Sequence, residues 1–223
     1  MAGVIGLLGA VGDFLPLAAA VSLSPFPIVA TTLVLARSDG VAAGTAFAAG
    51  WSASLAAVTL LLTFAVGELD FEVGAYVQIV VGLLLVAAGV AKWRGRTRGD
   101  DEPQVPGWMR ALREGPPGRI VLYGLALGAN PKNLALAAAA ASSISTRGLG
   151  GATAFLAAAI FVALGSLFVI GAVAARALGG SGTLARLESV RVFMLRHNGV
   201  IMMMVLLFLG LKVLGDGLAD IGS

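Results

Sequence analysis

The chain contains no cysteine and only one histidine, and these absences exclude several kinds of chemistry. Without cysteine there is no disulfide, no thiolate metal ligand and no thiol redox centre. Charged residues make up only 12% of the chain, and the carboxylates lie mostly outside its apolar stretches. The sequence therefore predicts no catalytic residue, no metal site and no cofactor, and we do not expect an enzyme.

The scarcity of charge accompanies an excess of apolar residues. Hydrophobic residues are 58% of the chain, and its mean hydropathy is +0.95. A soluble domain needs a polar surface that this chain cannot supply, so we expect lipid to cover most of it. The net charge of +3 could indicate nucleic acid, but the basic residues lie between apolar stretches, where membrane orientation explains them. We expect membrane lipids as partners and no nucleic acid.

Six apolar stretches are long enough to cross a bilayer as helices. They run approximately over residues 14–36, 41–66, 73–93, 119–144, 149–175 and 198–218. Residues 4–11 are also apolar, and they either extend the first helix or lie along the membrane interface. The sequence thus predicts an all-α integral membrane protein with six transmembrane helices, as a single transmembrane domain over residues 1–223.

The basic residues predict the orientation of these helices. Twelve of the fifteen Lys and Arg residues lie in the first, third and fifth loops, whereas Glu68, Asp70 and Glu72 lie in the second. Because cytoplasmic loops carry an excess of Lys and Arg, we expect the basic loops inside the cell and both termini outside.

Two segments between the apolar stretches have an amphipathic character. The linker over about 95–118 contains four prolines, and its residues 108–113 predict a short interfacial helix. Before the last stretch, Leu184, Leu187, Val190 and Met194 recur at helical spacing. Each segment is either a connector that rests on the lipid headgroups or a helix that binds a partner.

A pattern in the first half of the chain recurs in the second. Ser24-Pro25-Phe26-Pro27 lies inside the first apolar stretch and Asn130-Pro131-Lys132-Asn133 inside the fourth, and each stretch is followed by a turn with Arg and Gly. Three spans separate the copies, and an odd offset inverts the second copy in the membrane. The pattern predicts a 3+3 inverted repeat, with repeat one over about 1–94 and repeat two over about 119–223. Inverted repeats with broken helices are typical of membrane transporters.

The prolines predict breaks in the first and fourth helices. Proline has no amide hydrogen, so Pro25 and Pro27 would free the carbonyls of Val21 and Leu23, and Pro131 would free that of Leu127. Either the breaks form a substrate site, or they are simple kinks whose carbonyls the hydroxyls of Ser22, Ser24 or Thr31 rescue.

Lys132 lies about 13 residues into the fourth stretch, which places it roughly 20 Å deep in the bilayer. An intramembrane ammonium is costly and needs a partner. The candidates are the freed carbonyls, the amide oxygens of Asn130 or Asn133, and an anionic substrate. Lys132 is therefore either a structural lysine or a substrate contact, or both. The predicted substrate-binding residues are Lys132, Asn130, Asn133, Pro131, Ser24, Pro25 and Pro27.

Small residues in two stretches predict close helix packing. Gly124 and Gly128 are four residues apart, as are Gly44, Ala48 and Ser52 in sequence. They serve either packing within the chain or contact in a homodimer.

Taken with the six-span plan, Ser24-Pro25-Phe26-Pro27 and Gly128-Ala129-Asn130-Pro131-Lys132-Asn133 resemble the LysE exporter superfamily, and within it the GAP or Sap branch of peptidoglycolipid and sulfolipid addressing proteins. The resemblance covers nearly the whole chain. It implies the export of a lipid or glycolipid across the plasma (inner) membrane, through a site between helices one and four. The alternatives are an exporter of a small solute such as an amino acid, and a non-transporting membrane scaffold for a lipid-export machine.

Overall fold

The computed structural model describes residues 2–67, 71–95, 107–179 and 182–221, and these residues are mostly helical. The helices are α1 (Ala2–Ser22), α2 (Pro25–Leu35), α3 (Gly40–Gly67), α4 (Phe71–Arg94), α5 (Gly107–Glu114), α6 (Pro117–Gly128), α7 (Pro131–Thr146), α8 (Gly151–Gly165), α9 (Leu167–Leu178) and α10 (Thr183–Ile221).

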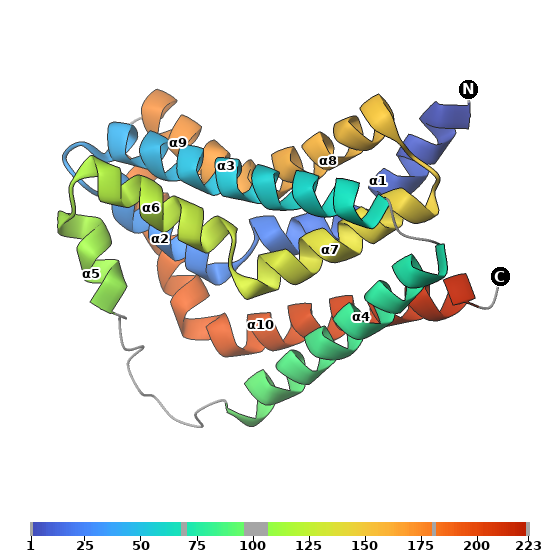
Figure 1. The fold of residues 1–223 in the computed structure, drawn as a ribbon. Helices are drawn as coiled ribbons and strands as arrows, with labels where there is room; N and C mark the ends of the chain where they lie inside the picture. The colour runs from blue at the N-terminus through green and yellow to red at the C-terminus, as the bar shows by residue number, and fades with distance from the viewer. Residues whose placement is uncertain (1, 68–70, 96–106, 180–181, 222–223) are drawn as a thin grey trace.

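Most of these helices form one elongated bundle. In Figure 1, α4 and α10 lie side by side along the lower edge, and α3 lies along α6 at the upper edge. Between these two pairs, α7 packs against α1, α3 and α4, while α1 also packs against α8. Both chain termini lie at one end of the bundle, and α5 lies at the opposite end (Figure 1).

Four helices are long and apolar enough to cross a membrane, namely those containing 3–22, 40–65, 75–94 and 183–221. A fifth candidate is the pair α8 and α9, which is bent by 55°. The chain is therefore a membrane protein with four to five candidate spans. The predicted stretches 14–36 and 119–144 are each divided between two helices, because the helices stop before Pro25 and Pro131.

Several predicted boundaries were wrong. Helix α1 begins at Ala2 rather than near residue 14, so residues 4–11 extend the first helix. Helix α10 begins at Thr183 rather than near residue 198, because the amphipathic segment that precedes the last stretch continues into it without a break. The second half, in contrast, begins with α6 at Pro117, close to the predicted start at about residue 119, and residues 96–106 of the predicted linker lie outside the described residues.

The predicted stretch 149–175 is bent where α8 ends at Gly165 and α9 begins at Leu167. Adjacent Gly and Ser residues are a recognised cause of sharp helix kinks, and Ser166 stands between the two helices. A residue of α1 stabilises the bend, because the Ser22 hydroxyl oxygen accepts a hydrogen bond of 3.1 Å from the backbone amide of Phe168.

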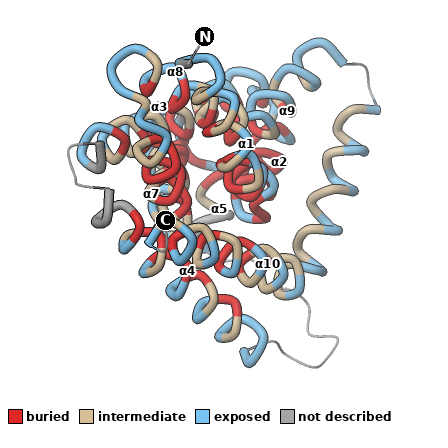
Figure 2. Tube along the Cα trace, turned by 90° about the vertical axis from the view of Figure 1, so that its right-hand side faces the viewer, coloured by how far each residue is buried: buried red, intermediate tan, exposed pale blue. Residues whose placement is uncertain are grey.

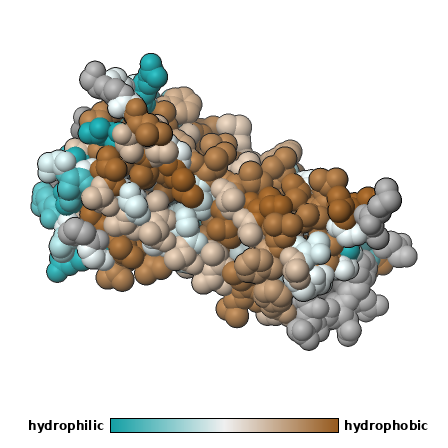
Figure 3. All heavy atoms as spheres, turned by 90° about the horizontal axis from the view of Figure 1, so that it is seen from above, coloured by the Kyte–Doolittle hydropathy of each residue, from teal (hydrophilic) through white to brown (hydrophobic). Residues whose placement is uncertain are grey.

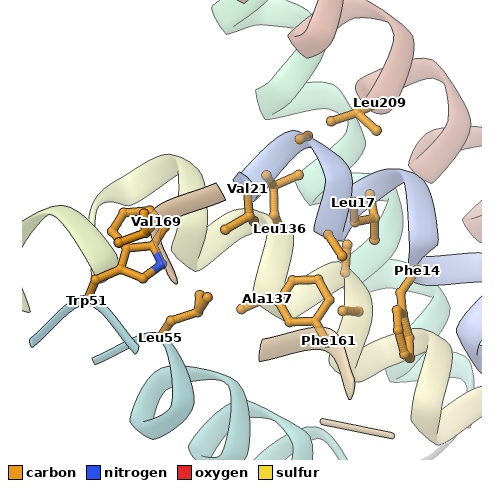
Figure 4. Close-up of a cluster of buried hydrophobic side chains, with 14 of the residues drawn as sticks. Phe14, Leu17, Val21, Trp51, Leu55, Leu136, Ala137, Phe161, Val169 and Leu209 are labelled. Atoms are coloured by element: carbon orange, nitrogen blue, oxygen red, sulfur yellow. The ribbon is translucent and has the colours of Figure 1, made fainter. Parts of the chain in front are cut away.

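The core lies where helices of both halves meet. Figure 4 shows Phe14 and Val21 of α1 beside Leu136 of α7 and Phe161 of α8. The rings of Phe14 and Phe161 meet edge to face, with their centroids 5.7 Å apart. In Figure 2, buried positions gather in α1, α2 and α7, whereas exposed positions follow the outside of the bundle. The central helices are thus the two that follow the proline breaks, together with α1.

Glycines allow α3 and α6 to approach closely. A Cβ atom added at Gly124 would lie 2.8 Å from the backbone nitrogen of Trp51, and one at Gly128 would lie 2.7 Å from the Trp51 carbonyl oxygen. Real Cβ atoms do not come so near to backbone atoms, so these positions exclude any larger residue. The small-residue pattern of Gly124 and Gly128 therefore serves packing within the chain.

Arg37 attaches α5 to the turn between α2 and α3. Its Nη1 lies 2.8 Å from the carbonyl oxygen of Arg113 and 3.0 Å from that of Gly115, at the end of α5. The same guanidinium forms two hydrogen bonds with the carboxylate of Asp39. The last carbonyls of a helix have no partner within it, and a cation there is favourable. The short helix predicted over 108–113 is present as α5, and Arg37 caps it.

One face of the bundle is largely apolar. Figure 3 shows mostly hydrophobic residues along this face and a group of hydrophilic residues at the end that carries α5. Such an apolar face suits contact with lipid. Glu68 and Asp70 of the predicted acidic loop lie outside the described residues, as does the side chain of Glu72.

Candidate functional site

Two broken helices form the centre of the candidate site. Helix α1 ends at Ser22 and α2 begins at Pro25, and α6 ends at Gly128 while α7 begins at Pro131. Ser24 and Asn130 precede the two prolines in the extended conformation, with φ/ψ of −65°/130° and −68°/157°. A residue before proline is driven to this region, and proline suits the first helical position because it lacks an amide hydrogen. The two Pro motifs therefore produce the same local geometry.

Lys132 joins the two breaks. Its ammonium donates a hydrogen bond of 2.8 Å to the carbonyl oxygen of Ala20, in the last turn of α1. The sequence offered the freed carbonyls near Val21 and Leu23 among the candidate partners, and the acceptor is the carbonyl of Ala20, the neighbour of Val21. Because α1 stops at Ser22, the amide of Ser24 bonds the carbonyl of Val21 instead of that of Ala20. The Ala20 carbonyl is therefore left to accept the hydrogen bond from Lys132.

Asn130 and Asn133 satisfy the second break. The side-chain oxygen of Asn130 accepts a hydrogen bond of 3.1 Å from the backbone amide of Asn133, which caps the start of α7. The amide nitrogens of both residues bond the Leu127 carbonyl, and Asn133 also bonds the carbonyl of Gly128 at 3.1 Å. The Leu127 carbonyl was predicted to be freed, and these two side chains are its partners.

Two buried polar atoms, one on α7 and one on α3, have no hydrogen-bond partner in the described part of the chain. One is the side-chain oxygen of Asn133, and the other is the indole nitrogen of Trp51, a buried residue of α3. The backbone of Trp51 lies against Gly128, where α6 ends. Buried polar groups are normally paired, so one unpaired acceptor and one unpaired donor are the kind of groups that a water molecule or ligand satisfies.

The first break is satisfied in a different way. Pro25, Pro27 and Ser24 are buried, but the Ser24 side chain does not cap α2. The Thr31 hydroxyl donates a hydrogen bond of 2.7 Å to the carbonyl of Pro27 within α2, so it does not reach the carbonyls of Val21 and Leu23 as the kink interpretation required. Lys132 thus links the second break to the region of Ser24, Pro25 and Pro27. It reaches that region through the carbonyl of Ala20.

An apolar cavity lies beside the bend between α8 and α9. It has a volume of about 250 Å³ and is lined by residues of α3, α8 and α9, among them Ser52, Phe155 and Ser166. The hydroxyls of Ser52 and Ser166 are 3.3 Å apart and form a hydrogen bond across it. Since Ser22 bonds the amide of Phe168, the end of α1 is attached directly to this bend.

A polar cavity of about 340 Å³ lies where the middle of α1 meets the start of α4 and the ends of α7 and α10. Asp13 and Arg147 form an ion pair of 2.8 Å there, and Gln78 donates hydrogen bonds to Ser142 and Asp220. The sequence analysis did not identify this cluster as a site. Its residues come from four helices that are far apart in sequence, so no spacing pattern marks them. Among the described residues, no group of three or more His, Asp and Glu side chains could hold a metal ion.

Comparison with known proteins gives one match. The model of the family described as Sap, sulfolipid-1-addressing protein, matches residues 14–219, which include both broken helices and Lys132. No curated protein and no solved structure matches the chain.

Proposed function

We propose a transport function from one premise: the chain belongs to the Sap, sulfolipid-1-addressing protein family, whose model matches most of its length. In this proposal it is a membrane transporter or flippase component that exports a lipid or glycolipid across the plasma membrane. The substrate site is the region of the two helix breaks, between α1 with α2 and α6 with α7.

The observation that carries the proposal is the contact between Lys132 and Ala20. An ammonium has three N–H donors, and one of them is used within the described residues. A cation inside an apolar bundle costs free energy, and a cation that is retained there is by default functional. We infer that an anionic or strongly polar headgroup takes the remaining donors of Lys132 when the site opens. The unpaired side-chain oxygen of Asn133, one residue after Lys132, would be a further acceptor for that headgroup.

The apolar cavity beside Ser166 supports a substrate with a hydrocarbon tail. Its walls are mostly Ala, Leu, Val, Ile and Phe side chains, and Phe155 and Ile170 are also exposed at the surface of the bundle. The hydrogen bond from Phe168 to Ser22 attaches this cavity to the helix that carries Ala20. A headgroup at Lys132 and a tail toward this cavity would suit an amphiphile better than a small hydrophilic solute.

The packing of the helices supports a 3+3 inverted repeat with six crossings. If α1 and α2 correspond to α6 and α7, then α3 corresponds to α8 with α9, and α4 corresponds to α10. Under this exchange the contact of α3 with α6 becomes that of α8 with α1, and the contact of α4 with α7 becomes that of α10 with α2; all four contacts are present. The pair of α4 and α10 exchanges with itself. Such a relation is typical of carriers that alternate access by moving one repeat against the other.

The proposed orientation places α5 and Arg37 in the cytoplasm and both termini outside. The hydrophilic residues at the α5 end of the bundle and the position of both termini at the other end support it (Figures 1 and 3). The linker between α4 and α5 then lies on the cytoplasmic side, as the excess of basic residues in that part of the sequence favours.

Three variants test the function, each in cells that contain no other copy of the protein. Lys132→Gln removes the charge, Lys132→Arg keeps it with a different geometry, and Lys92→Gln is the control, since Lys92 is exposed near the end of α4. We expect Lys132→Gln to be made and inserted into the membrane but to lose the export of lipid to the cell surface. Lys132→Arg should keep part of this export, and Lys92→Gln should keep all of it.

Melting of the purified variants in detergent separates this role from a structural one. If Lys132 serves only to bond the Ala20 carbonyl, Lys132→Gln will lower the melting temperature while export for each folded molecule stays unchanged. That result, or unchanged melting together with full export, would contradict the proposed substrate role of Lys132.

A further inference from the structure

A second cavity lies between the end of α9 and the start of α10, away from the broken helices. Its volume is about 450 Å³, within the range of about 300–1,000 Å³ that ligand sites have. Most of its walls are apolar, from Ala174, Ala175 and Leu178 on α9 and from Leu187 and Val190 on α10. Its polar side chains are those of Thr183 and Arg186, both in the first turn of α10.

The first part of α10 lies across the bundle rather than along it. In Figures 1 and 2 it turns away from the direction that the helix follows beside α4, at the end of the molecule that also carries α5. Its residues Met194 and Leu195 pack on Val29 and Leu33 of α2. A helix with one apolar face and several basic residues suits the surface of a membrane, at the level of the lipid headgroups.

The charge around this cavity is positive and mostly uncompensated. The Arg186 side chain has no hydrogen bond or ion pair with any described residue, and the Nε atom of Arg176 is buried without a partner. Glu188 is the one acidic residue between positions 183 and 197, and Arg191 already binds it. Arg186 is exposed at the polar end of the cavity, so its guanidinium is available to an anionic group.

We propose that this cavity binds an anionic membrane phospholipid from the adjoining leaflet, with one acyl chain between α9 and α10 and the phosphate at Arg186. The apolar walls match the chain, and the Thr183 hydroxyl and Arg186 guanidinium match the phosphate, to which arginine can donate two parallel hydrogen bonds. This proposal concerns the binding of a lipid and not its transport, so it does not depend on the function proposed for Lys132.

Native mass spectrometry of the purified full-length chain tests the proposal, with dioleoyl phosphatidylglycerol and dioleoyl phosphatidylcholine as probes at equal concentration. We expect the unchanged protein to retain more phosphatidylglycerol. Arg186→Gln should weaken the binding of phosphatidylglycerol about fivefold, the usual effect of one arginine near an anionic lipid, and leave phosphatidylcholine unchanged. Arg196→Gln is the matched control, with the same charge change ten residues later on α10, and it should leave both unchanged.

Filling the cavity tests the acyl chain separately. Val190→Trp on α10 and Ala175→Leu on α9 should each reduce the binding of both lipids, and the melting temperature of each variant shows whether it is folded; one folded variant is sufficient. Soluble glycerol phosphate should not displace the phospholipid. Equal losses with Arg186→Gln and Arg196→Gln, full binding in a folded filled variant, or displacement by glycerol phosphate would each overturn the proposal.

Discussion

The ammonium of Lys132 donates a hydrogen bond of 2.8 Å to the carbonyl oxygen of Ala20, 112 positions earlier in the chain. The bond joins the end of α1 to the start of α7, so it connects the two broken helices directly. The Ala20 carbonyl would not be available in a continuous helix, because it would bond the backbone amide of Ser24. The break before Pro25 therefore creates the acceptor for the half-buried Lys132.

Asn133→Ala should destabilise the protein, because Asn133 is buried and its amide bonds the carbonyls of Leu127 and Gly128. Leaving buried carbonyls without partners costs about 1–3 kcal/mol. Thermal or denaturant unfolding in detergent measures the effect. Asn198→Ala is the control, since the Asn198 side chain makes no hydrogen bond with the described residues. An equal effect of both substitutions would show that Asn133 does not stabilise the break.

Two glycines of α6 should respond to alanine in opposite directions. A Cβ atom at Gly124 would collide with the backbone of α3, whereas one at Gly118 would meet nothing within 4 Å. Alanine is a better helix former than glycine by about 1 kcal/mol, so Gly118→Ala should raise stability slightly. Gly124→Ala should lower it by about 1–3 kcal/mol through overpacking. Melting temperatures of the two variants test this, and a stable Gly124→Ala protein would contradict the close packing of α3 and α6.

Arg37→Gln should release α5 from the bundle. The Arg37 guanidinium bonds the carbonyls at the end of α5, and a glutamine amide cannot reproduce its fork of donors. Hydrogen–deuterium exchange of residues 107–114 should become faster, while exchange in α7 stays the same. Arg113→Gln, an exposed change on α5 itself, is the control. Unchanged exchange of α5 in Arg37→Gln would show that other contacts hold it.

The same arginine predicts a pH dependence at this end of the molecule. A hydrogen bond and the positive charge of Arg37 lower the pKa of Asp39 below its usual value. The stabilisation from this pair is therefore complete above the unfolded pKa of about 3.9 and is lost as the pH falls through the folded pKa. Between pH 5 and pH 3, the melting temperature of the unchanged protein should fall more than that of Asp39→Asn. Equal decreases in the two melting temperatures would show that the pair of Arg37 and Asp39 does not contribute to stability.

The helix breaks could be predicted from the sequence because their cause is local. Pro25 and Pro131 have no amide hydrogen, and that property does not depend on what surrounds them. The pairing of Lys132 with Ala20 could not be predicted, because the carbonyl that remains free depends on where α1 ends and on how α7 packs beside it. From the sequence, the freed carbonyls near Val21 and Leu23 were candidate partners alongside the amide oxygens of Asn130 or Asn133 and an anionic substrate, and nothing in the sequence distinguished between them.

The bend at Ser166 and the contacts of Arg37 show two other limits. A Gly–Ser pair such as Gly165 and Ser166 occurs both in straight packed helices and at kinks, so it predicts neither alone. Arg37 bonds carbonyls more than 70 positions away, and a backbone carbonyl has no sequence signature. The start of α10 was misplaced for a related reason: Arg186, Glu188 and Arg191 look like the end of a span, although they continue the same helix.

Lipid translocation by the purified chain in vesicles tests the central claim most directly, because it separates a transporter from a scaffold that needs other proteins. A fluorescent sulfated glycolipid is placed in one leaflet, and its appearance in the other is followed with an impermeant quencher. We predict faster translocation in vesicles that contain the unchanged protein, and a rate in Lys132→Gln vesicles no higher than in protein-free vesicles. Equal rates in all three, with folded protein confirmed by its melting, would contradict the claim that this chain itself moves a lipid across the membrane.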